Sequence, residues 1–485
     1  MNETPKKLEE KLEIIKKRLG FGVTFDLIIR ELNIAGRQAA LVFFDGFIKD
    51  IETVEIMKRL LNIPRGGLAL NVTEHIIKDF LPYFEVETKD NLDEAIDELL
   101  SGPMLLLIDG IIPIFVIDVR EYPVRSVEEP DLERVTRGSR EGFVETAIFN
   151  MVMVRRRVRD VNLRFEAMKV GKRSKTDVFL GYIDDIADPH LVKEVKKRIS
   201  TINRDALVMG GKNLTEYLVE KSFNPLPLTR YTERPDVVAA HLYEGHLAIF
   251  VDTTPFVLLI PVTAWHFTQH AEEYFQNPPV GTYLRWVRTF GIFLSLFLIP
   301  LWFAIVHTEN LPQWLEFIGP KEVGKVPLWV QFLLLEIGLD MIRMALIHTP
   351  NALATSLGIV GAILLGDLAV NVGIFAPEPI LYIAVVAIGT FGTPSLEFAH
   401  AIRIFRYLIF FGTVIFGWIG LGVTTLIVVL IFGLTNSFGV PYLWPLIPFD
   451  FPALLRIIFR YPIPSISVRP RMTDPKDQRA QKKKQ

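Results

Sequence analysis

The two halves of the chain differ in how apolar and polar residues alternate. Up to about Pro278, charged residues occur throughout and short apolar stretches are separated by turn residues. From Trp286 to about Phe432, long apolar runs dominate. A transmembrane helix needs roughly 20 mostly apolar residues, so we expect the second half to cross a membrane several times. The pattern predicts an α/β soluble N-terminal region of two tandem repeated subdomains, followed by an α-helical polytopic membrane domain.

Six segments follow from these patterns. The opening, "MNETPKKLEEKLEIIKKRLGFG", has no apolar segment of a secretory signal peptide, and its spacing predicts a charged amphipathic helix that ends at Gly20. The predicted order is an N-terminal amphipathic helix (1–23), a first α/β subdomain (24–125), a connecting helical segment (126–169), a second α/β subdomain (170–280), a membrane domain of about five helices (281–436), and an interfacial segment with a basic tail (437–485).

A sequence repeat relates the two predicted subdomains. "ALVFFDGFIKDIETVEIMKRL" (40–60) resembles "FLGYIDDIADPHLVKEVKKRI" (179–199), and each combines a β-run, an Asp turn and a helix with 3.6-residue apolar spacing. Residues 93–119 resemble 236–262, and we interpret their apolar ends as buried hairpins, not transmembrane segments. Asp favours turns by bonding its own backbone, so a turn role is preferred to a functional one for the repeated aspartates. These are Asp45, Asp109, Asp184 and Asp252.

Five apolar segments are candidate membrane helices: 286–308, 327–348, 351–375, 379–402 and 404–434. The last is too long for one untilted span. Either it is a double pass broken around Gly417–Gly422, or "PALLRIIFRYPI" dips into the membrane, and both explanations stay open. Five crossings put the tail outside, whereas its basic character favours the inside. Lys and Arg in short loops mark the cytoplasmic side, and four arginines predict that side for the N-terminal domain: Arg285, Arg288, Arg403 and Arg406.

The second apolar segment carries three charges, Glu336, Asp340 and Arg343, at a spacing that puts them on or near one helical stripe. A charge at the centre of a membrane helix costs roughly 2.5–3.5 kcal/mol. Either the stripe faces a subunit interface or a cation pathway, or Asp340 pairs internally with Arg343 to fix helix packing. The next segment is a candidate pore wall or subunit contact, with ordinary packing as the alternative, because small residues let helices approach closely. Its small residues include Gly358, Gly361 and Gly366.

Composition and motifs give no sign of an enzyme. The chain of 485 residues has no cysteine and a formal net charge of −2, which excludes thiolate metal sites and gives no argument for a nucleic-acid partner. No phosphate-binding loop, dinucleotide-binding fingerprint, zinc-protease motif or nucleophile elbow occurs. His266 and His270, with Glu273 nearby, have a spacing that can hold a metal. Because His, Trp and Tyr are also common at membrane interfaces, we predict no metal site, no cofactor and no catalytic residue.

Four long stretches of the chain are distinctive: "TERPDVVAAHLYEGHLAIFVDTTPFVLLIPVTAWHFTQHAEEYF" (232–275), "EGFVETAIFNMVMVRRRVRD" (141–160), "VGKRSKTDVFLGYIDDIADPHLVKEVKKRI" (170–199) and "LLLEIGLDMIRMALIHTPNALATSLGIVGAILLG" (333–366). They resemble the GerA-type spore germination proteins, the A subunits of germinant receptors. The resemblance runs from about residue 24 to 436. The opening at 25–50 and the tail at 450–472 resemble one branch of this family most.

The resemblance implies a multi-pass protein of the spore inner membrane that is used in germination, with its N-terminal domain facing the spore core or cytoplasm. The resemblance also implies the ring-shaped ion channel that the A subunits of this family form. The implied partners are therefore further copies of the chain, other germination membrane proteins and monovalent ions. A secondary transporter and a non-conducting scaffold are the alternatives. A transporter commonly has weakly repeated membrane halves, but here the repeat lies in the soluble half.

Overall fold

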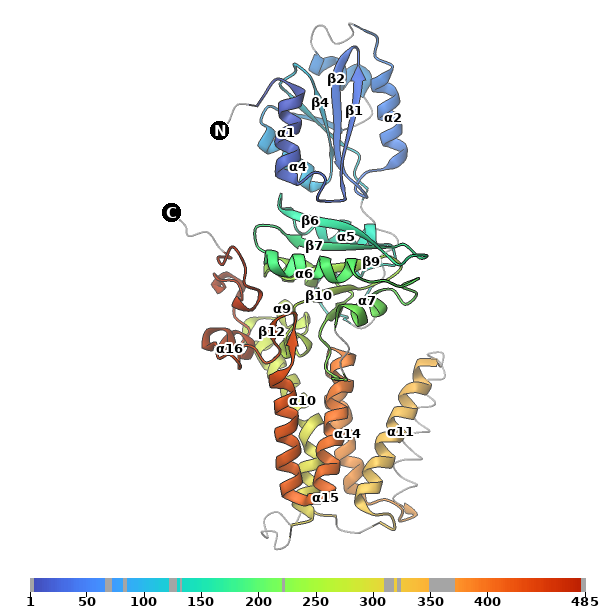
Figure 1. Cartoon of the computed structure of the whole chain (residues 1–485), viewed down its shortest axis with the longest axis vertical. Helices are drawn as coiled ribbons and strands as arrows, with labels where there is room; N and C mark the ends of the chain where they lie inside the picture. The colour runs from blue at the N-terminus through green and yellow to red at the C-terminus, as the bar shows by residue number, and fades with distance from the viewer. Residues whose placement is uncertain are drawn as a thin grey trace.

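The computed structural model describes residues 4–65, 72–81, 85–121, 129–130, 133–219, 223–308, 318–320, 324–348 and 371–480. The molecule is elongated (Figure 1). A first α/β unit, a second α/β unit and a helical bundle follow one another along its long axis.

Each α/β unit is built on a five-stranded antiparallel sheet, and the two sheets have the same strand order, β1-β2-β4-β5-β3 and β6-β7-β9-β10-β8. This confirms the predicted α/β N-terminal region, and β4–β5 and β9–β10 are the two expected hairpins. The strands are β1 (Leu27–Ile34), β2 (Arg37–Phe44), β3 (Glu85–Lys89), β4 (Met104–Ile108), β5 (Ile114–Asp118), β6 (Leu163–Val170), β7 (Thr176–Ile183), β8 (Arg230–Thr232), β9 (Leu247–Val251) and β10 (Val257–Ile260).

Helices cover both faces of each sheet, in a similar arrangement in the two units. In the first unit α1 and α4 pack on one face and α2 on the other. In the second unit α5 and α8 pack on one face, while α6 and α7 pack on the other. The helices are α1 (Leu8–Leu19), α2 (Asp50–Leu61), α3 (Val72–His75), α4 (Leu92–Ser101), α5 (Ala147–Arg155), α6 (Pro189–Ser200), α7 (Gly211–Leu218) and α8 (Pro235–Tyr243).

The second unit begins before the predicted residue 170, because α5 and β6 belong to it. The predicted connector at 126–169 is therefore not simply a link. Asp109 Oδ1 accepts a hydrogen bond from the Leu8 N–H at the start of α1 (2.9 Å). Asp252 Oδ1 accepts one from the Ala147 N–H at the start of α5 (3.2 Å). Since equivalent aspartates bind the first turns of both helices, α5 has the place in the second unit that α1 has in the first.

A buried ion pair joins the two α/β units. Arg155 of α5 lies 2.5 Å from Asp26, and their side chains are 2% and 6% exposed. The guanidinium also lies over the rings of Phe44 and Phe165, at 4.3 and 5.1 Å from their centroids. A buried charge that loses its partner is strongly destabilising. The ion pair between Arg155 and Asp26 therefore holds the two units together at one fixed contact.

The helical bundle contains α10, α11, α14 and α15, and α10 packs on both α14 and α15. The remaining elements lie around its junction with the second unit or follow it. The bounds are η2 (Ala264–Phe267), α9 (Glu272–Phe275), α10 (Pro278–Val306), α11 (Leu328–His348), α14 (Pro377–Phe391), α15 (Leu396–Leu434), β11 (Asn436–Ser437), β12 (Val440–Pro441) and α16 (Phe451–Ile458).

Helix α15 is two antiparallel arms that reverse at Gly417, whose φ of 58° and ψ of −136° are not helical. A straight helix of its 39 residues would be about 58 Å long. Instead the rings of Phe398 and Phe432, near its two ends, have centroids 6.4 Å apart. Of the two explanations for the long apolar segment, the chain reversal around Gly417–Gly422 is the one that the structure supports.

After α15 the chain returns to the second α/β unit. Lys476 Nζ donates to the Asp184 carbonyl oxygen (2.7 Å), and Arg469 Nε donates to the Tyr243 carbonyl oxygen (2.7 Å). Figure 1 shows the C-terminal segment beside this unit. The basic tail therefore lies at the same end of the bundle as the α/β units, which follows from the reversal in α15.

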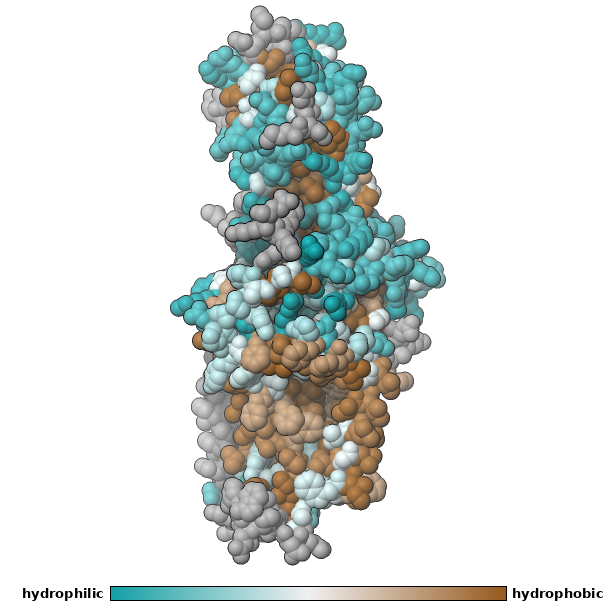
Figure 2. All heavy atoms as spheres, turned by 90° about the vertical axis from the view of Figure 1, so that its left-hand side faces the viewer, coloured by the Kyte–Doolittle hydropathy of each residue, from teal (hydrophilic) through white to brown (hydrophobic). Residues whose placement is uncertain are grey.

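Within the described residues, α10 and α15 are long and apolar enough to cross a membrane. Much of this apolar surface is uncovered. In the most apolar 18-residue stretch of α15, only 11% of the residues are buried. Figure 2 shows hydrophobic atoms gathered over the bundle and hydrophilic atoms over the α/β units. A contiguous exposed apolar surface of this kind marks contact with lipid or with another protein.

Candidate functional site

Glu336, the first charged residue of the α11 stripe, faces α15. Glu336 is buried, and its Oε1 lies 2.7 Å from Arg406 Nη2, with side chains 7% and 2% exposed. Arg406 Nη1 also donates to the Ser295 carbonyl oxygen of α10 (2.5 Å). Three helices therefore meet at one buried arginine, and Glu336 neutralises its charge.

Asp340 does not form the internal pair with Arg343 that was one of the two alternatives. It forms its ion pair with Arg403, because the facing α15 places this guanidinium beside the carboxylate. Arg343 Nη1 instead lies 3.2 Å from His400 Nε2, and its guanidinium lies 4.8 Å from the Phe391 ring centroid. In the described part of the chain Arg343 has no acidic partner. The stripe is thus divided between a packed residue, Glu336, and a partly exposed end, Asp340 and Arg343.

Arg403 and Arg406 are not loop charges, in contrast to the expectation that used them to orient the chain. Helix α14 ends at Phe391, and α15 begins at Leu396, where the Ser395 side chain caps it by accepting from Phe398 N–H (3.3 Å). Both arginines therefore lie inside α15. Sequence analysis did not identify the role of these two arginines. Arginine within an apolar run is as costly as the acidic residues of α11, and this cost was the signal that indicated a buried partner.

The predicted small-residue contact at Gly358, Gly361 and Gly366 lies outside the described residues. A close approach of this type does occur between Gly291 of α10 and Gly389 of α14. A Cβ atom on Gly389 would collide with the carbonyl oxygen of Gly291. Small residues bring helices together in this way where backbone contact replaces side-chain packing.

The four repeated aspartates all lie in turns. Two of them also bind a helix start, as described for Asp109 and Asp252. The other two occupy equivalent positions after β2 and β7: the N–H of Asp45 donates to the Asp26 carbonyl oxygen (2.7 Å), and that of Asp184 to Asn162 (2.9 Å). The side-chain contacts of Asp109 and Asp252 account for these two aspartates in structural terms, whereas the contacts of Asp45 and Asp184 are made by the backbone.

The group of His266, His270 and Glu273 is divided by the structure. Glu273 is fully buried and forms ion pairs with Arg285, at 2.6 Å, and with Arg288. His270 Nδ1 accepts a hydrogen bond from the Glu272 N–H (3.2 Å). Glu273 therefore serves to hold two arginines at the start of α10, and it is not free to bind a metal with the two histidines.

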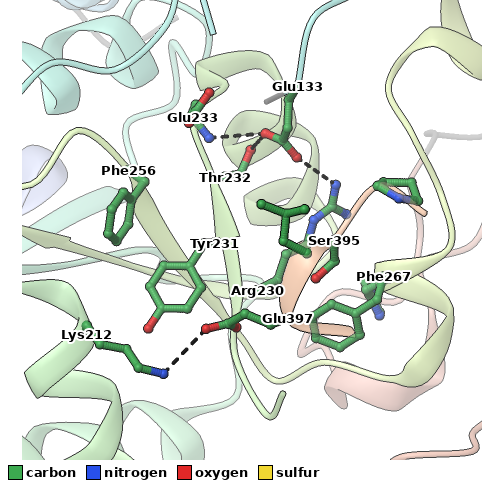
Figure 3. Close-up of a pocket in the computed structure, with 13 residues that line it drawn as sticks. Glu133, Lys212, Arg230, Tyr231, Thr232, Glu233, Phe256, Phe267, Ser395 and Glu397 are labelled. Atoms are coloured by element: carbon green, nitrogen blue, oxygen red, sulfur yellow. Dashed lines mark hydrogen bonds and ion pairs between the residues drawn. The ribbon is translucent and has the colours of Figure 1, made fainter. Parts of the chain in front are cut away.

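A cavity of about 310 Å³ lies at the junction between the second α/β unit and the start of α15 (Figure 3). Lys212 of α7 forms an ion pair with Glu397 of α15 across it (3.4 Å). The cavity is lined by Glu133, Lys212, Arg230, Tyr231, Thr232, Glu233, Phe256, His266, Phe267, Pro394, Ser395, Leu396 and Glu397.

The chemistry of this cavity combines aromatic walls with charges of both signs. Glu133 accepts hydrogen bonds from Thr232 Oγ1 (2.5 Å) and the Glu233 N–H (3.1 Å), and lies 3.5 Å from Arg230. Burial raises the pKa of Tyr231 to about 12, and its hydroxyl lies 2.7 Å from Thr215 Oγ1, which donates to the Gly211 carbonyl oxygen. Such a mixture of apolar walls and a few placed polar groups is typical of small-molecule sites. The residues that line the cavity come from both the second α/β unit and the start of α15, so the two regions meet here.

The two sheets of equal topology and the apolar bundle define a class of protein in which a duplicated α/β region precedes apolar helices. The family model of the Bacillus/Clostridium GerA spore germination protein matches residues 13–472. The chain therefore belongs to the GerA family, and this membership supports a role in spore germination.

Among its relatives, the chain is 42% identical to stage V sporulation protein AF of Bacillus subtilis (strain 168), over 96% of this chain and 94% of that protein. This is the branch that the opening and tail resemble. Spore germination protein KA of the same organism is 31% identical, covering 96% and 86%. The solved N-terminal domain of the A subunit of the Bacillus megaterium germinant receptor GerK3 is 31% identical, covers 53% of this chain and 96% of that chain, and has a TM-score of 0.41.

Proposed function

We propose that this protein is a multi-pass subunit of the spore inner membrane that assembles into an oligomeric ion channel, or a channel-like component, and promotes ion release during germination. The family membership supports the process, and the uncovered apolar surface of the bundle supports the membrane location. Monovalent ions would be the cargo, and further copies of the chain and other germination membrane proteins the partners. The proposal includes no catalytic activity and no nucleic-acid partner.

The observation that carries the channel proposal is the divided stripe of α11. Glu336 forms a buried ion pair with Arg406. The Asp340 side chain, in contrast, is 33% exposed. Arg343 lies near Asp340 and has no acidic partner among the described residues. Ionisable residues within membrane helices are costly and typically face a bundle interior, a partner or water. The exposed end of the stripe therefore supports a subunit interface or an ion pathway on this face of α11.

The orientation proposed for the N-terminal region is the spore core or cytoplasm. Arg285 and Arg288 at the start of α10 support it, and so does the basic tail, which lies at the same end of the bundle. Lys and Arg accumulate on the cytoplasmic side of membrane proteins. The junction cavity then lies on that side, where a change in the second α/β unit would reach α15 through Lys212 and Glu397.

Purified full-length protein in mild detergent, followed by reconstitution in liposomes, tests the proposal. Native mass spectrometry should give an oligomer, and the liposomes should release monovalent ions. Arg343→Gln should change ion flux or selectivity while the oligomer still assembles. Met341→Leu is the matched control, because Met341 lies on the same helix and is 62% exposed.

A monomer that conducts no ions, alone or with its membrane partner, would contradict the channel proposal. An oligomer without flux would favour the alternative of a non-conducting scaffold. Ion-driven uptake of a solute, in place of passive release, would favour the secondary transporter.

A further inference from the structure

Three histidines, one buried and two half-buried, meet on the side of the second α/β unit that faces the junction. His241 belongs to α8, His246 precedes β9, and His266 belongs to η2. One ring nitrogen of each lies within 4.8 Å of the other two. The ring centroids are 4.9, 5.5 and 5.2 Å apart. The chain thus gathers three strong metal-ligand side chains from three separate elements.

In His241 and His246, the Nδ1 atom forms a hydrogen bond with a backbone carbonyl oxygen. His241 Nδ1 lies 2.8 Å from the Val237 carbonyl oxygen, and His246 Nδ1 lies 2.8 Å from that of Pro261. Since a carbonyl only accepts, each Nδ1 carries the proton and each Nε2 presents a lone pair. His246 is 0% exposed, and its Nε2 is buried without a hydrogen-bond partner. Metal-ligating histidines have this arrangement, in which the second nitrogen donates to a fixed acceptor.

The third ring can reach the same state by a change of tautomer. His266 Nδ1 lies 3.0 Å from the Thr263 N–H and 2.9 Å from Thr263 Oγ1. Without an ion, Nδ1 accepts from the N–H and the proton resides on Nε2. If the proton resides on Nδ1, this nitrogen loses its hydrogen bond from the Thr263 N–H and donates to Oγ1 instead, and Nε2 becomes a ligand.

We propose that His241, His246 and His266 bind one divalent transition-metal ion, with Zn²⁺ as the best match to three imidazole ligands. Three histidines leave a fourth position of a tetrahedral site for water or another group. His266 also lines the junction cavity, which gives a route for that ligand. Binding would satisfy the unpartnered nitrogen of His246.

The surroundings favour neutral ligands. Burial lowers the pKa of His246 to about 4 and that of His241 and His266 well below the ordinary value, so all three rings are neutral at neutral pH. Neutral imidazole is the form that binds metals. Arg230 is the nearby positive charge that opposes a cation, and its ion pair with Glu133 reduces this effect.

The ion would connect the second α/β unit to the bundle. His241 and His246 belong to the unit, whereas His266 lies in the segment that leads to α10. Its neighbour Phe267 stacks on Phe398 of α15, with centroids 5.6 Å apart. A metal at this position would fix the junction between the two regions, whether or not the protein conducts ions.

Metal titration of the full-length protein in detergent tests this inference. After treatment with a chelator and its removal, Co²⁺ should bind at one equivalent per chain and give the visible absorption of a four-coordinate ion, and Zn²⁺ should displace it. Zn²⁺ should also raise the Tm. His246→Gln should abolish the absorption and the Tm shift, whereas His190→Gln, an exposed histidine on α6, should leave both unchanged.

A second variant keeps the test decisive if His246→Gln fails to fold. Thr263→Val retains all three histidines but removes the acceptor of the His266 proton, and loss of such an outer contact typically weakens affinity by about 10–100-fold. The inference is overturned if the folded wild-type chain binds neither ion, or if both variants bind with wild-type affinity.

Discussion

Arg406 of α15 forms a buried ion pair with Glu336 of α11, with 2.7 Å between Nη2 and Oε1. Arg406 also bonds the Ser295 carbonyl oxygen of α10, so one side chain links three helices. Of the three charges on α11, the one closest to the helix start is therefore a packing residue. The proposed role in ion conduction therefore falls to the exposed end of the stripe, Asp340 and Arg343.

Replacement of Glu336 should first affect stability. In Glu336→Gln the Arg406 charge stays buried without compensation, and breaking a buried pair in this way costs about 3–5 kcal/mol. Thermal unfolding of the detergent-solubilised protein measures the change. The double variant Glu336→Met with Arg406→Leu removes both charges and should recover most of the loss. Normal stability of Glu336→Gln with altered ion flux would instead place Glu336 in the pathway.

The contact between Gly291 and Gly389 makes a second prediction. A leucine at position 389 would put its Cβ against the carbonyl oxygen of Gly291, which forces α10 and α14 apart. Overpacking of this kind costs about 1–3 kcal/mol, and we expect a lower Tm for Gly389→Leu. Gly433→Leu is the control, because a Cβ there meets nothing within 4 Å. Equal Tm values for the two variants would rule out a tight backbone contact.

The repeated aspartates should fall into two groups. Asp252→Ala removes the acceptor of the Ala147 N–H at the start of α5, and loss of a helix-capping contact costs about 0.5–2 kcal/mol. Asp184→Ala removes only an exposed side chain 3.8 Å from Lys476 Nζ, which should change stability by less than about 0.5 kcal/mol. Denaturant unfolding followed by circular dichroism compares them. A larger effect for Asp184→Ala would point to a role beyond its turn.

The local features of this fold could be predicted, whereas its long-range contacts could not. The repeat exposed the hairpins and turns because each is encoded within a short stretch of alternating or apolar residues. The pairing of Asp340 with Arg403 depends on which helix faces α11, so the nearer Arg343 was the natural but wrong partner. The histidine group has the same origin: His241 and His246 meet His266 only after α8, β9 and η2 have packed.

The reversal at Gly417 predicts on which side of the membrane the tail lies. The chain has no cysteine, so single cysteines can be introduced at exposed positions: Thr201→Cys in the second α/β unit, Gln478→Cys in the tail and Ile419→Cys beside the reversal. In sealed inside-out membrane vesicles, a membrane-impermeant maleimide should label positions 201 and 478 but not 419. Right-side-out vesicles should give the opposite pattern, and detergent should expose all three. Because the tail bonds the second α/β unit through Lys476 and Arg469, positions 201 and 478 must share one side. Labelling of these two positions on opposite sides would contradict the hairpin.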